Sequence, residues 1–155
     1  MITVAEALAH IFDLVAPIGT ETLPLAEAAG RALATPVTAT RSQPPFAAAS
    51  MDGYAVKASD LLAASDGKPV TLRVVDDVPA GYRASVELRE GAAIRIMTGA
   101  PLPEGAEAIV PLEWTDGGMP EVRITRSVNR GAHVRRRGDD VALGEVVATA
   151  GTVLG

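Results

Sequence analysis

The chain has no cysteine and few aromatic residues: two Phe, two Tyr and one Trp among 155 residues. Without thiols it forms neither disulfides nor thiolate metal sites, which suits a reducing compartment. An aromatic content of 3% argues against binding of single-stranded nucleic acid, which depends on aromatic stacking platforms. The core is therefore expected to consist of Val, Leu, Ile and Ala.

Other features are also missing. A formal net charge of −5 argues against a general polyanion-binding surface. No apolar run approaches the roughly 18 residues that span a membrane, and the N-terminus, with Glu6, lacks the basic and apolar blocks of a secretory signal. His10 and His133 lie far apart, without the spacing of a zinc site. We expect a cytoplasmic protein that binds neither nucleic acid nor membrane.

What is present is an ordinary globular balance of 48% apolar and 21% charged residues, long enough for one domain or two small ones. Thr3 and Glu6 form a capping-box pattern. Apolar residues then recur at three- and four-residue spacing: Ala5, Leu8, Ile11, Phe12 and Val15. The pattern predicts an amphipathic helix that ends near Pro17, with His10 on its polar side. Its apolar stripe is either core or a subunit contact, and core is the preferred interpretation.

Short elements follow this helix. A helical turn is predicted at 26–29, stopped by Gly30. A short helix is predicted at 59–64, capped by Ser59, and a turn at 66–67.

The sequence from Val70 onward has the character of strands. Alternation at 70–74 predicts a half-buried strand that is broken at Asp76-Asp77. Further strands are predicted at 93–97, 108–114, 122–125, 144–147 and 152–154. Pro111 indicates an edge or bulge in the 108–114 strand, and residues 116–118 predict a hairpin joining it to the next. The predicted fold class is mainly β with some α: a small β-barrel or coiled sheet at 41–140, and a helix-containing module made of 1–40 and 141–155.

The segment 44–56 is the main candidate for a functional loop. Two prolines at 44 and 45 predict an extended segment that turns there. Asp52-Gly53 predicts a tight turn, in which the glycine tolerates a positive φ, so that the Asp52 carboxylate is displayed at a bend. Ser50 and the small residues before it allow a ligand to come close. The alternative is an ordinary loop turn without function.

Two other turns carry polar groups suited to an anionic ligand. Thr98-Gly99 follows a strand, so its hydroxyl and N–H groups could hold a phosphate or a metal-bound water; alternatively, the hydroxyl bonds its own loop backbone. The run 135–137 places three arginines, whose guanidinium groups match oxyanions, before Asp139 and Asp140, whose carboxylates suit Mg²⁺. The alternative there is a solvated surface with local ion pairs.

Four segments in order resemble the molybdopterin molybdotransferase family, the MoeA and gephyrin E-domain proteins. They are Pro-Pro-Phe at 44–46 with Ser-Met-Asp-Gly-Tyr-Ala-Val at 50–56, then 95–106, 108–111, and Arg-Arg-Arg-Gly-Asp-Asp at 135–140. Ordered matches over most of the chain are more specific than a single motif.

The resemblance implies an enzyme that takes molybdate and adenylylated molybdopterin, cleaves the adenylate with Mg²⁺, and yields molybdenum cofactor and AMP. It suggests Asp52, Thr98 and Asp140 as catalytic residues, with both aspartates also as metal ligands. Asp52 and Asp140 would position the metal or the attacking oxygen, and Thr98 would orient the ligand. The candidate substrate-binding residues are Ser50, Gly99 and Arg137.

The sequence departs from the family at Ala47-Ala48, where an Asp-Asn pair is usual. The resemblance covers the family's N-terminal region, without its pterin-binding α/β domain and C-terminal β domain. We therefore expect a chain that folds but does not complete the reaction alone. The family further implies a homodimer, in which the helix-containing module serves dimerisation, and the adenylyl-pterin-producing enzyme as a candidate partner.

Two other functions remain open. One is a non-catalytic β-barrel that serves interaction or dimerisation. The other is a nucleic-acid-binding barrel, which rests on the three arginines and is weakened by the net charge and the few aromatics.

Overall fold

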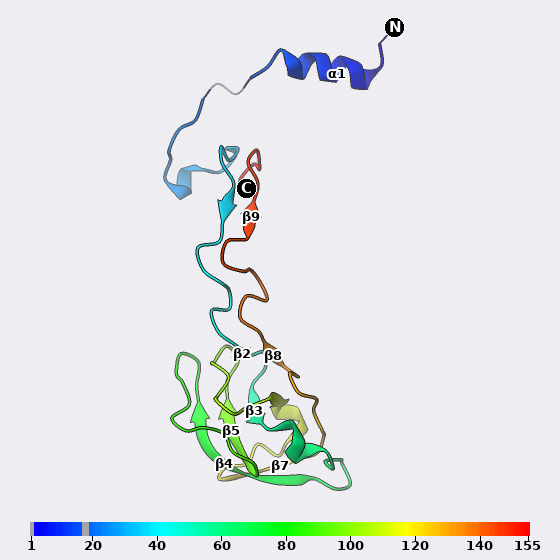
Figure 1. The fold of residues 1–155 in the computed structure, drawn as a ribbon, viewed down its shortest axis with the longest axis vertical. Helices are drawn as coiled ribbons and strands as arrows, with labels where there is room; N and C mark the ends of the chain where they lie inside the picture. Colours follow the sequence, from blue (N-terminus) through cyan, green and yellow to red (C-terminus); the bar gives the residue numbers. More distant parts are fainter. Residues whose placement is uncertain (1, 17–18) are drawn as a thin grey trace. The chain divides into compact units, whose positions relative to one another are not determined.

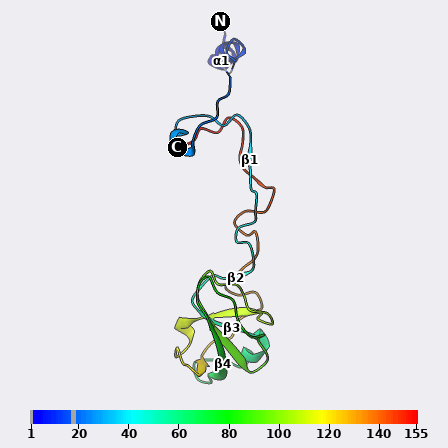
Figure 2. The same ribbon diagram turned by 90° about the vertical axis from the view of Figure 1, so that its left-hand side faces the viewer.

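The computed structural model describes residues 2–16 and 19–155, which form two compact units (Figures 1 and 2). One unit contains the described residues up to Val37 together with Val146–Gly155, and the other is Thr38–Glu145. The expected helix end near Pro17 lies outside the described residues. No helix of the described ranges is long and apolar enough to cross a membrane.

The first unit begins with α1 (Val4–Asp13), and its capping box is confirmed. The Thr3 N–H donates to Glu6 Oε2 at 2.7 Å, and the Glu6 N–H donates to Thr3 Oγ1 at 3.2 Å. These two bonds satisfy backbone groups that the helix itself leaves free, so the sequence locates the helix start correctly.

The apolar stripe of α1 is exposed, and the prediction that it forms core is wrong for this chain. The exposed fractions are 46% for Leu8, 54% for Ile11, 70% for Phe12 and 66% for Val15. No described residue of this unit is buried, so the unit offers the stripe no core to join. Helical spacing shows that one face is apolar, whereas burial depends on what covers that face.

The remainder of this unit is short and irregular. The predicted turn at 26–29 is a 3₁₀ helix, η1 (Leu25–Glu27), followed by Gly30 at φ 77°. Of the two predicted C-terminal strands, the first is β9 (Val146–Ala148), which pairs with β1 (Val37–Thr38). The second is present only as a short antiparallel pairing centred on the Val153–Ala32 bridge, with the Leu33 N–H donating to the Thr152 carbonyl and the Leu154 N–H to the Arg31 carbonyl, each at 2.9 Å.

The second unit holds a five-stranded curled sheet in the order β6-β3-β5-β4-β7 (Figure 1). Its strands are β3 (Gly53–Val56), β4 (Val70–Val78), β5 (Ala92–Ile96), β6 (Ala108–Pro111) and β7 (Glu121–Ile124). β4 and β5 run parallel, and the other neighbours are antiparallel. The predicted class, mainly β with a coiled sheet and a helix, is confirmed.

Both faces of this sheet are covered by apolar side chains. One cluster contains Tyr54, Val110 and Ile124, and the other contains Ala55 and Ile94. Adjacent strand residues point to opposite faces, so β3 contributes Tyr54 to one cluster and Ala55 to the other. β3 is therefore buried along its whole length and anchors the bend that precedes it.

Three predictions about strand boundaries and pairing need correction. β4 is not broken at Asp76-Asp77 but continues to Val78, with a register shift between Val74 and Asp76. The predicted 108–114 strand ends at Pro111 and continues as the 3₁₀ helix η3 (Leu112–Trp114). The predicted hairpin is present only in part. β7 pairs with β4 along one edge, and on its other edge the segment before the turn adds one antiparallel bridge, Thr115 to Ile124, flanked by backbone bonds from Thr125 N–H to the Trp114 carbonyl at 2.9 Å and from Asp116 N–H to the Arg123 carbonyl at 3.2 Å.

Of the other local predictions, the edge strand and the turn at 66–67 are confirmed, and the short helix at 59–64 needs correction. β6 is an edge strand of the sheet, as Pro111 indicated. The turn at 66–67 is confirmed by reciprocal backbone bonds between Ser65 and Lys68. The helix at 59–64 is instead η2 (Ala58–Leu61), which starts before Ser59 and has no side-chain cap. A further two-stranded sheet of β2 (Ala48–Ala49) and β8 (Val134–Arg135) was not predicted.

Candidate functional site

Asp52 and Thr98 meet at an exposed rim of the second unit. Asp52 lies at the bend between β2 and β3, and Thr98 lies in the turn after β5. Asp52 Oδ1 accepts the Thr98 hydroxyl at 2.6 Å and the Thr98 N–H at 2.7 Å. The alternative in which this hydroxyl bonds its own loop backbone is therefore wrong.

These bonds stabilise the ionised form of Asp52. The Thr98 hydroxyl, followed by the Thr98 N–H, lowers the pKa of the Asp52 carboxyl below its usual value, and the more distant Arg95 charge acts in the same direction. Hydrogen bonds to the ionised form stabilise that form. Both bonds go to Oδ1, so an ionised carboxylate is presented with Oδ2 outside this pair of bonds.

The backbone around Asp52 is held by neighbouring elements. The Asp52 carbonyl accepts the Leu112 N–H at 3.0 Å, and Ser50 N–H donates to the His133 carbonyl at 3.0 Å. Gly99 N–H donates to the Ala49 carbonyl at 2.9 Å. The candidate residues Ser50 and Gly99 thus lie on the same two turns as Asp52 and Thr98.

Gly53 serves a different purpose from the one predicted. It does not take a positive φ but begins β3, opposite Ile96 on one side and Pro111 on the other. A Cβ at this position would lie 1.9 Å from the Val110 carbonyl oxygen. Close approach of two backbones is thus the reason for glycine here. The sequence signal for this was its position directly before the apolar residues of a strand.

Asp140 belongs to a second polar turn. Its Oδ2 forms an ion pair with Arg135, which lies on β8 opposite Ala48. The Asp140 N–H donates to the Gln43 carbonyl at 2.9 Å, which ties this turn to the segment before β2. Arg137 is exposed in the same turn. The recorded bonds join Asp140 to Arg135 and Gln43 and do not join it to Asp52.

The fit of a metal ion can be judged from these side chains. Within residues 2–16 and 19–155, no group of three or more His, Asp or Glu side chains could hold a metal ion. Mg²⁺ often takes only one or two protein carboxylates and completes its shell with water and substrate phosphates. Asp52 fits that mode, whereas the Asp140 carboxylate is engaged by Arg135.

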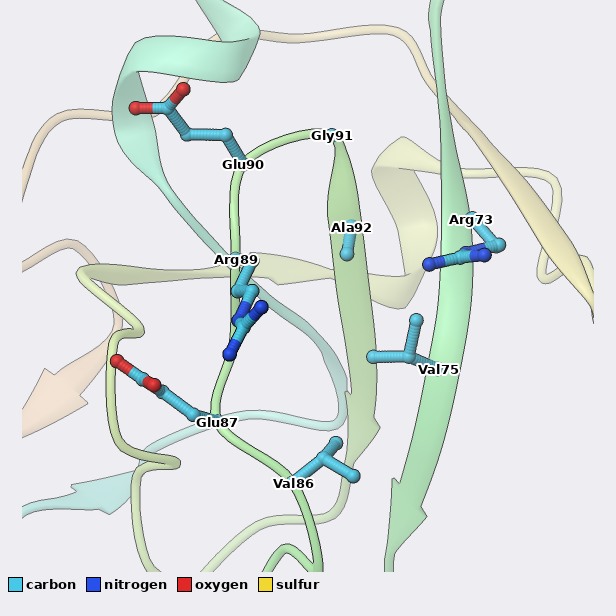
Figure 3. A pocket seen from close by; sticks show the side chains of 8 residues that line it. All are labelled: Arg73, Val75, Val86, Glu87, Arg89, Glu90, Gly91 and Ala92. Carbon is cyan, nitrogen blue, oxygen red and sulfur yellow. The ribbon is translucent and has the colours of Figure 1, made fainter.

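A groove of about 580 Å³ lies elsewhere on the second unit (Figure 3). It is lined by Arg73 and Val75 of β4, by Ala92 of β5, and by five residues of the loop before β5: Val86, Glu87, Arg89, Glu90 and Gly91. It contains none of the candidate site residues. The groove is therefore separate from the Asp52 site, which is an exposed rim.

Comparison with known proteins identifies relatives along the whole chain. A family model described as "MoeA N-terminal region (domain I and II)" matches residues 2–155. A molybdopterin molybdenumtransferase 2 of Mycobacterium tuberculosis is 47% identical over 133 residues, which cover 86% of this chain and 33% of the relative. The molybdopterin molybdenumtransferase of Bacillus subtilis is 36% identical over 155 residues, which cover 97% of this chain and 36% of the relative.

The fold is similar to that of a solved structure. The crystal structure of the molybdopterin biosynthesis MoeA protein from Pyrococcus horikoshii OT3 superimposes with a TM-score of 0.89 at 38% identity. The similarity covers 97% of this chain and 40% of that one. The chain spans about a third of the length of the curated relatives quoted above.

Proposed function

The chain belongs to the MoeA N-terminal region family, and we propose that it supplies the Asp52–Thr98 rim to an enzyme that inserts molybdate into adenylylated molybdopterin. The products are molybdenum cofactor and AMP. The names of the relatives support the enzyme class, molybdopterin molybdenumtransferase. We propose the substrates, the products and a cytoplasmic location in addition to that enzyme class.

The observation that supports the site is the double hydrogen bond from Thr98 to Asp52 Oδ1. A carboxylate whose pKa is lowered is a poor proton acceptor at neutral pH. Asp52 would therefore act through its charge and position, with Oδ2, which accepts neither Thr98 bond, available to hold a metal ion or to orient the attacking oxygen. Thr98 would orient the Asp52 carboxylate in addition to orienting the ligand.

The remaining candidates have supporting roles in this proposal. Ser50 and Gly99 border the ligand beside Asp52, and Arg137 binds anionic oxygens of the substrate. Mg²⁺ would be held by Asp52, with Asp140 as a second ligand only if its ion pair with Arg135 opens. When bound, the metal neutralises charge on the substrate phosphates.

We further propose that the chain is inactive alone, because an open rim does not enclose a substrate. The pterin would be bound by the part of the enzyme that corresponds to the remaining two thirds of the quoted relatives. The adenylyl-pterin-producing enzyme is the partner that would deliver the substrate.

A domain graft tests this function. Residues 2–155 replace the matched N-terminal region of the Bacillus subtilis relative, and AMP release is measured with adenylylated molybdopterin, molybdate and Mg²⁺. We expect the graft to release AMP and the 155-residue chain alone to release none. A folded graft without turnover would contradict the proposed function.

The exposed stripe of α1 supports a second role, as a dimerisation surface. Phe12 is 70% exposed and Leu8 46%, and an uncovered apolar face of this kind marks an interaction site. We propose that a second copy of the chain covers it. Phe12→Glu is expected to shift the chain from dimer to monomer in sedimentation, whereas His10→Glu on the same helix is not. A wild-type chain that stays monomeric at high concentration would refute this role.

A further inference from the structure

His133 has an unusual backbone conformation. It is the only residue other than glycine, within the described ranges, that has a positive φ, and the value is 54°. A residue with a Cβ is uncommon in the left-handed region, and its free-energy cost has to be offset by surrounding contacts. Such a residue is a reason to look for a function of its position.

The conformation forms a corner between two backbone ladders. Before the corner, the chain runs along the outer edge of β6, where the Ile109 N–H donates to the Ala132 carbonyl at 3.0 Å. After the corner, the chain becomes β8 and pairs with β2. The left-handed residue turns the chain from the first ladder into the second.

His133 itself makes the first contact of the second ladder. Its carbonyl accepts the Ser50 N–H at 3.0 Å, next to the Ala49–Val134 pair, so the pairing of β2 and β8 extends by one residue. Ser50 is the residue at which the bend to Asp52 begins.

The imidazole ring supports this corner. It packs edge-to-face against Trp114, with ring centroids 5.6 Å apart and an interplanar angle of 76°. The guanidinium of Arg126 lies 5.3 Å from the centroid of the Trp114 ring. Aromatic pairs in this arrangement are stabilising, so the contact offsets part of the cost of the left-handed backbone.

Trp114 belongs to the 3₁₀ helix η3, which also holds the Asp52 end of the bend between Ser50 and Asp52. Trp114 is the last residue of η3, and Leu112 is the first. The Leu112 N–H donates to the Asp52 carbonyl at 3.0 Å. Thus η3 holds Asp52 directly through Leu112, and it holds Ser50 indirectly through Trp114 and His133.

We propose that His133 is a positioning residue of the Asp52–Thr98 site. Trp114 holds its ring, the ring keeps the corner in the left-handed conformation, and the corner places the carbonyl that binds Ser50. The bend from Ser50 to Asp52 then presents the carboxylate to Thr98. The structural part is independent of the proposed function, and only its effect on turnover rests on that function.

Amide hydrogen exchange in the 155-residue chain tests the structural part. The variants are His133→Ala, which loses the ring and keeps a Cβ, and His133→Gly, which adopts the corner without cost but also loses the ring. The control is His10→Ala, which removes an exposed imidazole from α1. Exchange is compared between the Ser50 amide and the amides of β5, which report on the core.

We expect the protection of the Ser50 amide to fall about tenfold more than that of β5 in His133→Ala, because alanine keeps the cost of the left-handed backbone and loses the ring contact that offsets it. A smaller selective loss is expected in His133→Gly, and none in His10→Ala. Equal losses at Ser50 and β5 would show a merely structural role and overturn the proposal. If His133→Ala does not fold, the same comparison in His133→Gly decides.

Turnover of the domain graft tests whether His133 affects catalysis at the Asp52–Thr98 site. His133→Gly is expected to lower kcat several-fold and to leave KM for adenylylated molybdopterin unchanged. An inactive wild-type graft, together with selective loss at Ser50, would reject the proposed function and support the positioning role. Suppose that the wild-type graft is active and that His133→Gly selectively lowers the protection of the Ser50 amide. An unchanged kcat in that variant would then overturn the claim that His133 affects catalysis.

Discussion

Gly53→Ala is expected to destabilise the second unit by about 3 kcal/mol, at the upper end of the usual cost of overpacking. The added Cβ would lie 1.9 Å from the Val110 carbonyl oxygen and 3.1 Å from the Leu112 nitrogen. These are backbone atoms and cannot rotate away as a side chain would. Relief therefore requires β3 to separate from β6, along which all four residues of β3 are paired.

Urea unfolding measured by circular dichroism would quantify this loss. Gly67→Ala is the matched control, because Gly67 has an ordinary φ and nothing within 4 Å of the added Cβ. It is expected to be neutral or slightly stabilising, since alanine lowers the entropy of the unfolded chain. Equal unfolding midpoints for the two variants would contradict the assigned role of Gly53.

Asp52→Asn in the domain graft is expected to lower turnover about 100-fold, the order of the loss when one electrostatic group of an active site is removed. The amide keeps the size of the side chain but removes the charge that Thr98 stabilises. Because Asp52 is exposed, we expect little change in stability. Measurement of AMP release and of the unfolding midpoint in the same variant separates these two effects.

Asp76→Asn provides a closely matched control for this variant. Asp76 Oδ2 accepts the Ser85 N–H at 2.7 Å and the Ser85 hydroxyl at 2.9 Å, and its pKa is lowered in the same direction. It thus repeats the chemistry of the Asp52–Thr98 pair away from the candidate site. If both variants lose turnover equally, or neither does, the specific role of Asp52 is refuted.

Local features were predicted well because they depend on residues close together in the chain. The capping box uses two residues three positions apart, Thr3 and Glu6, and the turn before Pro69 uses a bonded pair that is equally close, Ser65 and Lys68. The edge position of β6 followed from the missing N–H of Pro111.

Pairing and burial were predicted less well because they depend on distant partners. β7 resembled the second strand of a hairpin, yet it lies beside β4, where Val122 and Ile124 enter the core. Asp76 was expected to end its strand, but its carboxylate is satisfied by Ser85. The stripe on α1 was expected to be core, but none of the described residues of its own unit is buried.

The sequence by itself determined the family, the apolar strands, the start of the first helix and which polar residues stand in turns. These follow from periodicity, capping chemistry and motif order, which are all properties of neighbouring residues. Only the tertiary structure decided that Thr98 bonds Asp52, that Arg135 engages Asp140, and that Gly53 is needed for close approach to β6. Each of these contacts depends on how the sheet curls and which strands are adjacent, and composition and spacing along one chain do not specify those positions in space.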